Sequence, residues 1–317
     1  MNSSKNKLIS IIIPVYNAEK YIVETLESIR KQSIENWELV IVDDASEDNT
    51  ELVIQEYIKE HPSRSIVYEK LSQNSNAAVA RNEAMKIAKG SLFAFCDADD
   101  LWESNHLEVA LKYIEKEQAD IVYSTMNVVD DQTGEKIGMQ GPSEEHINDF
   151  PNSLFWSPYN FIQPSAVVMK RGVYEDVGGF DASFRRSQDF EYFLNIVGAG
   201  YSFYYISDIT SNLRRGHISS VSSISLLAEY HALALRKHRS INRVPRSIRM
   251  DALSYSHLIV AKNVYKKKPI KAAFFLFWSW FGNPIKIKYL LFIPLLYIYS
   301  FFSQFKNLFY IEEKKKF

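Results

Sequence analysis

Strand-like and helix-like segments alternate along the first two thirds of this sequence, and the alternation restricts the folds open to the chain. Runs rich in β-branched and aromatic residues predict strands at 8–15, 37–43, 66–71, 91–96, 120–125, 161–170 and 201–206. Between them, apolar residues three and four positions apart predict helices, such as the one carrying Ile22, Leu26 and Ile29. This order is typical of βαβ units. The sequence therefore predicts an α/β fold with a doubly wound, mostly parallel sheet.

Polar residues follow several of the predicted strands at their carboxyl ends. Asn17 follows the first strand, Asp43 and Asp44 close the second, and 97–100 follow the fourth. Ligands of doubly wound sheets bind beyond the carboxyl ends of the strands. We therefore expect the functional site at this edge of the sheet.

The later part of the chain predicts further elements and a change of domain. Residues 130–160 are polar and rich in turn formers, which predicts an exposed loop or hairpin. Gly90 is expected to end the preceding helix as its C-cap, and a later helix is expected to open at Gln188. The domains we expect are a catalytic domain over 1–225, with a nucleotide-binding half (1–100) and an acceptor half (101–225), and a helical region over 226–317.

Composition excludes several classes of protein. Hydrophobic residues make up 46% of the chain and charged residues 24%, which suits a buried core and not a disordered chain. A single cysteine cannot form an intramolecular disulfide or a zinc cluster, which excludes a disulfide-stapled secreted module. The apolar run at 8–15 is too short for a signal peptide, so the body is expected in the cytoplasm.

The two ends of the chain differ strongly in charge. Residues 1–230 hold 20 Lys and Arg against 35 Asp and Glu, whereas 231–317 hold 17 against 3. An acidic body repels the phosphate backbone of nucleic acid, so we expect no nucleic-acid partner. A basic, apolar C-terminal region is typical of attachment to an anionic membrane surface.

The acidic run Asp97-Ala98-Asp99-Asp100 is a candidate metal site. In an extended chain, the side chains of Asp97 and Asp99 point the same way. Crowded carboxylates are tolerated where a divalent cation lies among them, and Mg²⁺ or Mn²⁺ held there can neutralise a diphosphate leaving group. A solvated acidic turn before the next helix explains the same residues equally well.

Asp43 and Asp44 have a similar double interpretation. A carboxylate at this strand end can accept hydrogen bonds from a base or a ribose hydroxyl, as the acidic residue of dinucleotide folds does. It can also cap the helix predicted over 48–57. Both roles are compatible.

In order and spacing, four segments resemble family 2 glycosyltransferases of the GT-A fold. They are ISIIIPVYNAEKYIVETLESIRKQSIENWELVIVDDASEDNT, NAAVARNEAMKIAKGSLFAFCDADDLW, GGFDASFRRSQDFEYFL and RRGHISSVS, and the resemblance extends over residues 8–222. It implies a GT-A fold, a nucleotide-sugar donor and a divalent metal, Mn²⁺ or Mg²⁺. The chain departs from the family in having Gln188 where glutamate is usual before the aspartate.

The resemblance also implies roles for individual residues. Asp189 matches the proposed catalytic base, and Asp99 and His217 match positions near the metal. The residues implied to bind the nucleotide or its diphosphate are Pro14, Tyr16, Asn17, Asp43, Asp44, Arg81 and Asp97.

Asp189 can be considered independently of the family. It is expected in the first turn of a helix, where the helix dipole favours the ionised carboxylate. Such a carboxylate can take the proton of an attacking sugar hydroxyl. Without the resemblance, a helix-capping residue would be the simpler interpretation.

The C-terminal region carries two aromatic-rich apolar runs. Residues 272–281 and 289–302 are each shorter than the roughly 20 residues of a membrane-spanning helix. Lys286 and Lys288 separate the two runs, and Pro284 and Pro294 interrupt helices. Residues 262–317 therefore predict peripheral or monotopic attachment at the cytoplasmic face of the membrane. A helical subdomain packed on the body or a partner is the alternative.

The leading hypothesis is an inverting, metal-dependent glycosyltransferase of hexosyltransferase type. It would move a sugar from a nucleotide-diphosphate donor, a UDP-sugar by default, to a lipid-linked or growing glycan in surface polysaccharide biosynthesis. Donors based on dTDP or GDP stay open. One alternative is transfer to polyprenyl phosphate, and another is a catalytically silent nucleotide-sugar binding module at the membrane.

Overall fold

The computed structural model describes residues 7–157, 159–215, 224–264 and 268–282, together with Pro294. The chain divides into two compact units. The first consists of Met1–Phe150 and Tyr159–Val221, and the second of Pro151–Pro158 and Ser222–Phe317. That the first unit is the catalytic domain and the second the membrane-associating region stays a prediction.

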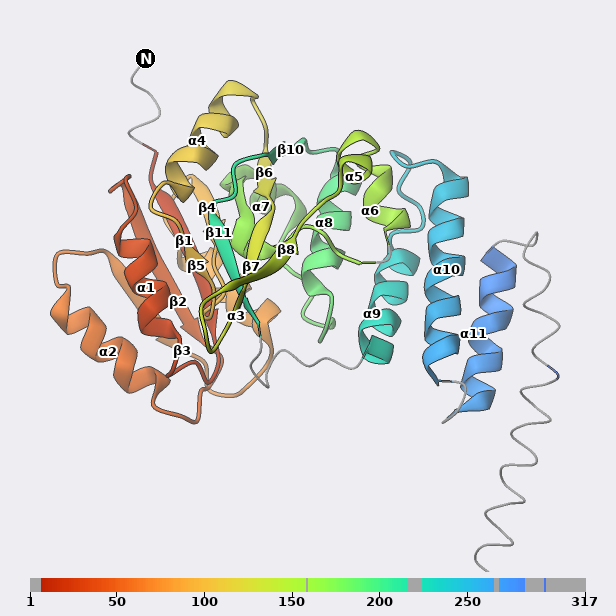
Figure 1. The fold of residues 1–317 in the computed structure, drawn as a ribbon, viewed down its shortest axis with the longest axis horizontal. Coiled ribbons are helices and arrows are strands. Elements are labelled where there is room, and N and C mark those ends of the chain that lie inside the picture. The colour runs from red at the N-terminus through yellow and green to blue at the C-terminus, as the bar shows by residue number, and fades with distance from the viewer. Residues whose placement is uncertain (1–6, 158, 216–223, 265–267, 283–293, 295–317) are drawn as a thin grey trace, which may run out of the picture. The chain divides into compact units, whose positions relative to one another are not determined.

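A seven-stranded sheet forms the centre of the first unit (Figure 1). Its order is β10-β6-β9-β4-β1-β2-β3, and β9 alone in this sheet runs antiparallel to its neighbours. The strands are β1 (Ile9–Val15), β2 (Trp37–Asp43), β3 (Ile66–Lys70), β4 (Leu92–Phe95), β6 (Ile121–Ser124), β9 (Val167–Lys170) and β10 (Phe203–Ile206). The predicted α/β fold with a mostly parallel sheet is confirmed.

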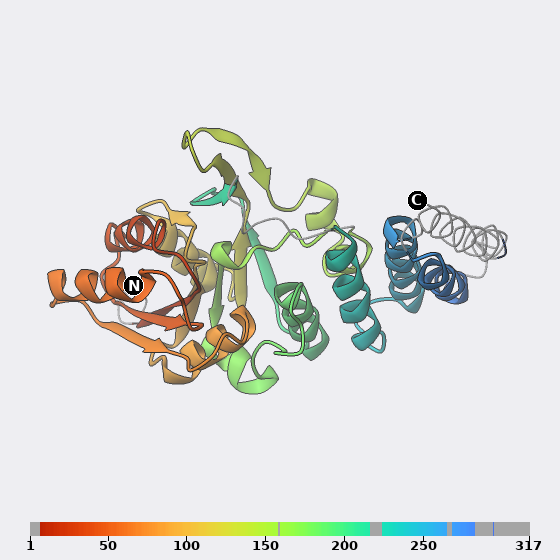
Figure 2. The same ribbon diagram turned by 90° about the horizontal axis from the view of Figure 1, so that it is seen from below.

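Helices cover both faces of this sheet, because the central strands are apolar on both sides (Figure 2). Ile9, Ile11 and Ile13 of β1 share one buried cluster with residues of α1 (Ile22–Arg30), α2 (Thr50–Glu60) and α4 (His106–Lys116). On the opposite face, the rings of Phe93 and Tyr174 lie 5.7 Å apart, and those of Phe95 and Phe180 5.8 Å. The helices of this face are α3 (Ala77–Ile87), α7 (Arg171–Val177) and α8 (Gln188–Ala199).

A second, four-stranded sheet lies in the same unit, with the order β5-β11-β7-β8. Its strands are β5 (Leu101–Trp102), β7 (Met126–Asp130), β8 (Lys136–Gln140) and β11 (Ser211–Arg215). The β7–β8 pair is the hairpin expected within 130–160. The rest of that region forms two short helices that the sequence did not predict, α5 (Glu144–Asn148) and α6 (Asn152–Trp156).

Gly90 does not cap a helix, contrary to the prediction. The helix α3 ends at Ile87, and Ala88 is its C-cap residue. A Cβ at Gly90 would lie 2.6 Å from the backbone nitrogen of Ser10, so the glycine is required by close packing against β1. Its N–H and the Ser10 hydroxyl both donate hydrogen bonds to the buried carboxylate of Glu38.

Helices make up the described part of the second unit. The helix α10 (Arg246–Val264) packs against α9 (Ile224–Lys237), α11 (Pro269–Gly282) and α6. The Ser279 hydroxyl donates to the Ser254 carbonyl, which joins α11 to α10. None of the helices in the described ranges has both the length and the apolarity needed to cross a bilayer. The second apolar run, residues 289–302, lies outside the described residues except for Pro294.

A buried histidine makes the stability of the first unit sensitive to acid. The His106 ring stacks on Trp102 with centroids 4.3 Å apart, and its Nδ1 shares a 2.8 Å hydrogen bond with the Thr210 hydroxyl. Burial lowers the pKa of His106 to about 3. Because the unfolded chain binds this proton near pH 6.5 and the folded chain does not, stability is lost as the pH falls from 6.5 towards 3.

We expect His106→Phe to weaken this acid sensitivity, because phenylalanine keeps the stacking and cannot be protonated. Between pH 7.5 and pH 5, the wild-type chain should lose about 2 kcal/mol more unfolding free energy than the variant. Urea unfolding followed by circular dichroism at the two pH values measures the difference. Buried histidines elsewhere are common to both proteins and cancel. An equal loss in both proteins would contradict this account.

Candidate active site

The loops after β1 and β2 are hydrogen-bonded to each other at the carboxyl edge of the sheet. The Asn17 N–H donates to the Ser46 hydroxyl at 2.9 Å, and the Asn17 side-chain oxygen accepts the Glu47 N–H at 2.9 Å. Asn17 adopts a left-handed backbone, with φ of 48°, which asparagine tolerates better than most residues. These bonds fix the position of the turn after β1.

Asp43 is buried and uses both carboxylate oxygens within the protein. Its Oδ1 accepts the Ser46 N–H at 2.7 Å, and its Oδ2 accepts the Tyr68 hydroxyl at 2.9 Å. Burial is the largest cause that raises the pKa of Tyr68, and the hydrogen bond to Asp43 is the next. The phenol therefore keeps its proton. Asp43 therefore holds the β2–α2 turn and the edge strand β3 in place.

Asp44 connects the second strand to the start of α3. Its Oδ1 accepts the Ser75 N–H at 2.8 Å, and Ser75 precedes Asn76, the N-cap residue of α3. Burial raises the pKa of Asp44, and the neighbouring charge of Asp43 adds to the rise, while backbone N–H groups oppose it. The pair of aspartates thus lies where α3 begins.

The same helix carries Arg81 into the interior, where it pairs with the acidic run. The Arg81 guanidinium donates to Oδ1 of Asp97, and it lies 5.4 Å from the centre of the Phe180 ring. The side chain of Arg81 is only 6% exposed, against 35% for Asp97. A buried arginine beside a half-exposed carboxylate is not a surface charge, and its position is consistent with a role near an anionic ligand.

Asp189 lies close to this pair, in the first turn of α8 as predicted. Its Oδ2 accepts the Asn160 side-chain N–H at 2.9 Å. Burial raises the pKa of Asp189 from its ordinary value, and the charge of Asp97 adds to the rise. The Phe190 N–H, the charge of Arg81 and the Asn160 amide act in the opposite direction. The helix N-terminus therefore acts as predicted, but burial outweighs it.

The turn that carries Asp99 is fixed by the carboxylate of Asp100. The Ser165 hydroxyl donates to Asp100 Oδ2 at 2.5 Å and accepts the Asp97 N–H at 2.9 Å, while the Arg214 N–H donates to Asp100 Oδ1 at 3.2 Å. Burial raises the pKa of Asp100 well above its ordinary range, and the charges of Asp99 and Asp97 add to this. Asp99 itself is half-buried beside them.

Three further predicted site residues have different positions. Pro14 is buried within β1, paired in register with Val42, and Tyr16 is 46% exposed just after the strand. His217 lies outside the described residues. The structure therefore brings Arg81, Asp97 and Asp189 together. It also hydrogen-bonds the loop after β1 to the loop after β2. The helix α3, which begins beside Asp44 and carries Arg81, links these loops to the cluster.

The sequence did not predict three residues that shape this site. Asn160 hydrogen-bonds Asp189, Ser165 bridges Asp97 and Asp100, and Phe180 packs on Arg81. Asn160 and Ser165 lie in irregular or 3-10 segments, where no hydrophobic period marks a position. Asp100 was part of the acidic run, but only the tertiary structure shows that it is buried.

Arg81 provides a test of this geometry. Replacing Arg81 with methionine removes a positive charge that lowers the pKa of Asp189, so the carboxyl should hold its proton to higher pH. We expect the acid limb of the pH profile of kcat/KM to move to higher pH and activity near neutral pH to fall. Arg64→Met, at the opposite edge of the sheet and stacked on Trp37, is the matched control. An unshifted acid limb in the Arg81 variant would contradict the proposed coupling.

Comparison with known families and curated relatives points to one enzyme family. The family model described as Glycosyl transferase family 2 matches residues 10–178. The amylovoran biosynthesis glycosyltransferase AmsB of Erwinia amylovora is 31% identical over 208 residues, covering 64% of this chain and 68% of the relative. The Escherichia coli enzyme WfgD, named as a UDP-Glc:alpha-D-GlcNAc-diphosphoundecaprenol beta-1,3-glucosyltransferase, is 38% identical over 129 residues. That match covers 40% of this chain and 48% of WfgD, less than half of that relative.

Solved structures agree on the fold. S. aureus TarS 1–349 in complex with UDP-GlcNAc superimposes with a TM-score of 0.67 at 20% identity, covering 92% of this chain and 86% of that chain. The mannosyltransferase PcManGT from Pyrobaculum calidifontis, in complex with GDP-Man and Mn²⁺, gives a TM-score of 0.61 at 20% identity, covering 95% and 86%. At this identity the likeness establishes the GT-A fold.

Proposed function

Because the chain belongs to glycosyltransferase family 2, and is thus a glycosyltransferase, we propose that it catalyses inverting transfer of a sugar from a nucleotide diphosphate. The acceptor we propose is a lipid-linked or growing glycan in surface polysaccharide biosynthesis. The observation that carries the proposal is the cluster of Arg81, Asp97 and Asp189 at the carboxyl edge of the sheet, beside the turn bearing Asp99.

The donor we propose is a UDP-sugar, bound across the ends of β1 and β2. The names of WfgD and of the TarS complex support this choice, and the loop geometry supports the location. Asn17 and Asp44 border the site, with Pro14 and Tyr16 at the end of β1. Asp43 holds the turn. The resemblance implies base and ribose contacts for both Asp43 and Asp44, but the buried Asp43 uses both carboxylate oxygens within the protein. We therefore assign these contacts to Asp44, and the neighbourhood of the diphosphate to Arg81 and Asp97.

Asp189 is proposed as the catalytic base. A sugar hydroxyl attacks poorly until its proton is removed in the transition state. A raised pKa makes the carboxylate a stronger base, while the charge of Arg81 and the Asn160 amide favour its ionised form. The Asn160 amide orients the carboxylate. Transfer from the face opposite the leaving diphosphate inverts the anomeric carbon.

The carboxylate chemistry of the acidic turn fits a divalent cation. Mg²⁺ is commonly held by one or two carboxylates together with substrate phosphates. In the ranges that the structure describes, no group of three His, Cys, Asp or Glu residues is arranged to hold a metal. We propose that Asp99, with His217, holds Mn²⁺ or Mg²⁺. When bound, the ion would neutralise charge on the diphosphate.

Residues 262–317 are proposed to bind an anionic membrane surface, at its cytoplasmic face. On α11, Ile270, Phe274 and Phe277 are exposed at helical spacing. Aromatic and aliphatic side chains on one helix face, with lysines nearby in the sequence, favour attachment in the plane of a membrane. A lipid-linked acceptor, as in the name of WfgD, would be presented at such a surface.

The product distinguishes this proposal from its main alternative. We would incubate the protein with radiolabelled UDP-sugars, Mn²⁺ and a bacterial lipid extract, and analyse the labelled product. Label in a lipid-linked oligosaccharide with a new glycosidic bond supports the proposal. A single-sugar phosphodiester would instead identify transfer to polyprenyl phosphate. No labelled product from any UDP-, dTDP- or GDP-sugar would contradict both.

A further inference from the structure

A polar hollow lies on one face of the second sheet, and its lining contains none of Arg81, Asp97 and Asp189. It has a volume of about 550 Å³ and is lined by residues of β7 and β11, by Leu101 of β5 and the following Glu103, by the β7–β8 turn with the first residue of β8, and by one residue of α1. Leu101, Asn127, Val129, Asn212 and Arg214 all line it. Asn127 and Val129 are two positions apart on β7, as are Asn212 and Arg214 on β11, and Leu101 pairs with Asn212. All five therefore belong to one face of the sheet. A hollow of this size suits a small ligand such as a disaccharide.

The floor of the hollow is a row of polar side chains already held in position. The Asn127 amide donates to the Asn212 side-chain oxygen at 2.9 Å, and the Asn212 amide donates to Glu103 Oε1 at 2.9 Å. These three side chains come from β7, β11 and the residue after β5. The row offers both donors and acceptors, which is what adjacent sugar hydroxyls require. Leu101 and Val129 add apolar surface beside it.

Arg214 interacts with residues on both sides of the hollow. Its guanidinium donates to Glu24 on α1 at 2.8 Å and lies 3.9 Å from Asp131 on the hairpin turn. It also lies 5.2 Å from the centre of the Tyr21 ring, and the Tyr21 hydroxyl donates to Asp131 at 2.9 Å. Because these side chains are held before any ligand arrives, less ordering would oppose binding.

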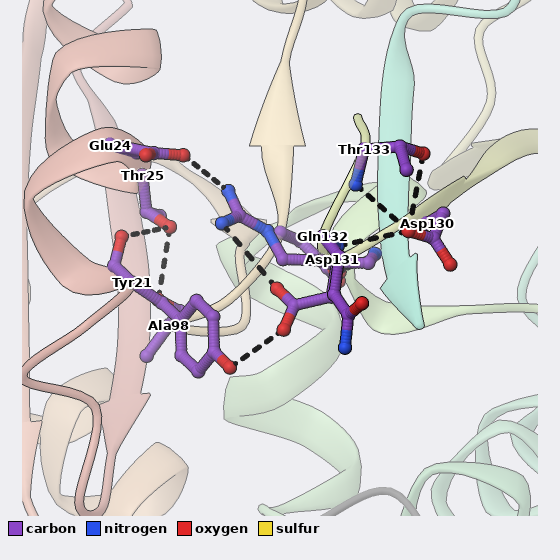
Figure 3. Close-up of polar contacts among 10 residues, drawn as sticks. Tyr21, Glu24, Thr25, Ala98, Asp130, Asp131, Gln132 and Thr133 are labelled. Atoms are coloured by element: carbon purple, nitrogen blue, oxygen red, sulfur yellow. Dashed lines mark hydrogen bonds and ion pairs between the residues drawn. The ribbon is translucent and has the colours of Figure 1, made fainter. Parts of the chain in front are cut away.

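The hairpin turn is held by hydrogen bonds of its own (Figure 3). Asp130 Oδ1 accepts the N–H groups of Gln132 and Thr133 at 3.0 and 2.9 Å. The Asp131 N–H donates to the Arg215 carbonyl at 2.8 Å. The side of the hollow formed by this turn therefore has a fixed shape.

The charge of the hollow narrows the class of ligand. Four carboxylates line it, from Glu24, Glu103, Asp130 and Asp131, against the two cations Lys136 and Arg214. A net negative lining disfavours a nucleotide or a diphosphate. A neutral, hydroxyl-rich ligand fits this lining, because its hydroxyls can donate to the carboxylates.

The hollow is connected to the acidic turn of the active site. The Arg214 N–H donates to Asp100, which directly follows Asp99 and lies three residues after Asp97. A glycan whose reacting hydroxyl is at the active site could therefore extend a further sugar into the hollow.

We propose that this hollow is a carbohydrate subsite that binds a neutral, non-reacting sugar unit of the acceptor or product glycan. The identity of that glycan rests on the proposed function, whereas the existence of a sugar site does not. It assigns the row of Glu103, Asn127 and Asn212 to acceptor recognition.

Saturation-transfer NMR on the full chain tests the subsite, with lactose, cellobiose and N,N′-diacetylchitobiose as probes. We expect at least one of them to bind, and the double variant Asn127→Ala/Asn212→Ala to weaken it about tenfold through two lost hydrogen bonds. Lys136→Ala, at an exposed position of the lining, should weaken binding without risk to folding. Asn105→Ala, an exposed asparagine at the start of α4 that makes no capping bond, is the control.

UDP binding, measured in the same samples, reports separately on the proposed function. It should be equal in the wild-type chain and all three variants. A wild-type chain that binds a disaccharide but not UDP would contradict the proposed donor and leave the subsite supported. A chain that binds none of the three disaccharides, or whose double and Lys136 variants bind as tightly as the wild type, would overturn the subsite.

Discussion

Asp189→Asn is expected to lower the kcat of sugar transfer by about 10²- to 10⁴-fold, the range that a general base supplies. Asparagine has nearly the same shape, and its side-chain oxygen can still accept the Asn160 amide, so the site should stay assembled. What is lost is the ability to take the acceptor's proton. The affinity for UDP should change little, because the change removes a group that acts on the acceptor.

The measurement is single-turnover transfer together with UDP binding. Asp176→Asn makes the same chemical change at a surface aspartate that accepts the Tyr201 hydroxyl, and it should behave like the wild type. Transfer by the Asp189 variant within a fewfold of the wild-type rate would rule out the proposed base. A variant that also loses UDP binding would point to a structural role for Asp189 instead.

Asp99→Asn is expected to give the second largest effect, a loss of about a hundredfold or more in activity. An amide is a weaker ligand than a carboxylate for a hard cation. The affinity for UDP should therefore no longer rise when Mn²⁺ is added, which is a readout independent of turnover. Isothermal titration of UDP with and without Mn²⁺ measures it.

The matched control for Asp99 is Asp208→Asn, an exposed aspartate that accepts the Tyr113 hydroxyl. It should keep the full response to Mn²⁺. If the Asp99 variant also keeps that response, the ion is held by other residues and the assignment of Asp99 is wrong.

The central strands could be predicted from the sequence because burial on both faces leaves a continuous apolar run. The first two strands begin and end within a residue of the predicted limits. The second sheet could not be predicted in this way. The strand β11 reads Ser-Asn-Leu-Arg-Arg, and only its pairing with β5 and β7 makes it a strand. The strand β9 begins at Val167 rather than at 161, because a 3-10 turn precedes it.

Part of the site was predictable for the same reason. Strand ends mark the carboxyl edge, so Asn17, Asp43 and Asp97 could be placed there from sequence. The partners of these residues could not be predicted. Arginine is usually a surface residue, and only the folded chain shows that Arg81 is buried on Asp97. Asn160 contacts Asp189 from an irregular segment that no periodicity describes.

The most direct test of the central claim is release of UDP from UDP-sugars by the purified protein, with Mn²⁺ and with EDTA. The account predicts that one UDP-sugar is turned over with Mn²⁺, that EDTA abolishes the turnover, and that Asp189→Asn abolishes it while UDP still binds. Turnover that persists undiminished in both EDTA and the Asp189 variant would contradict a metal-dependent transferase with Asp189 as its base.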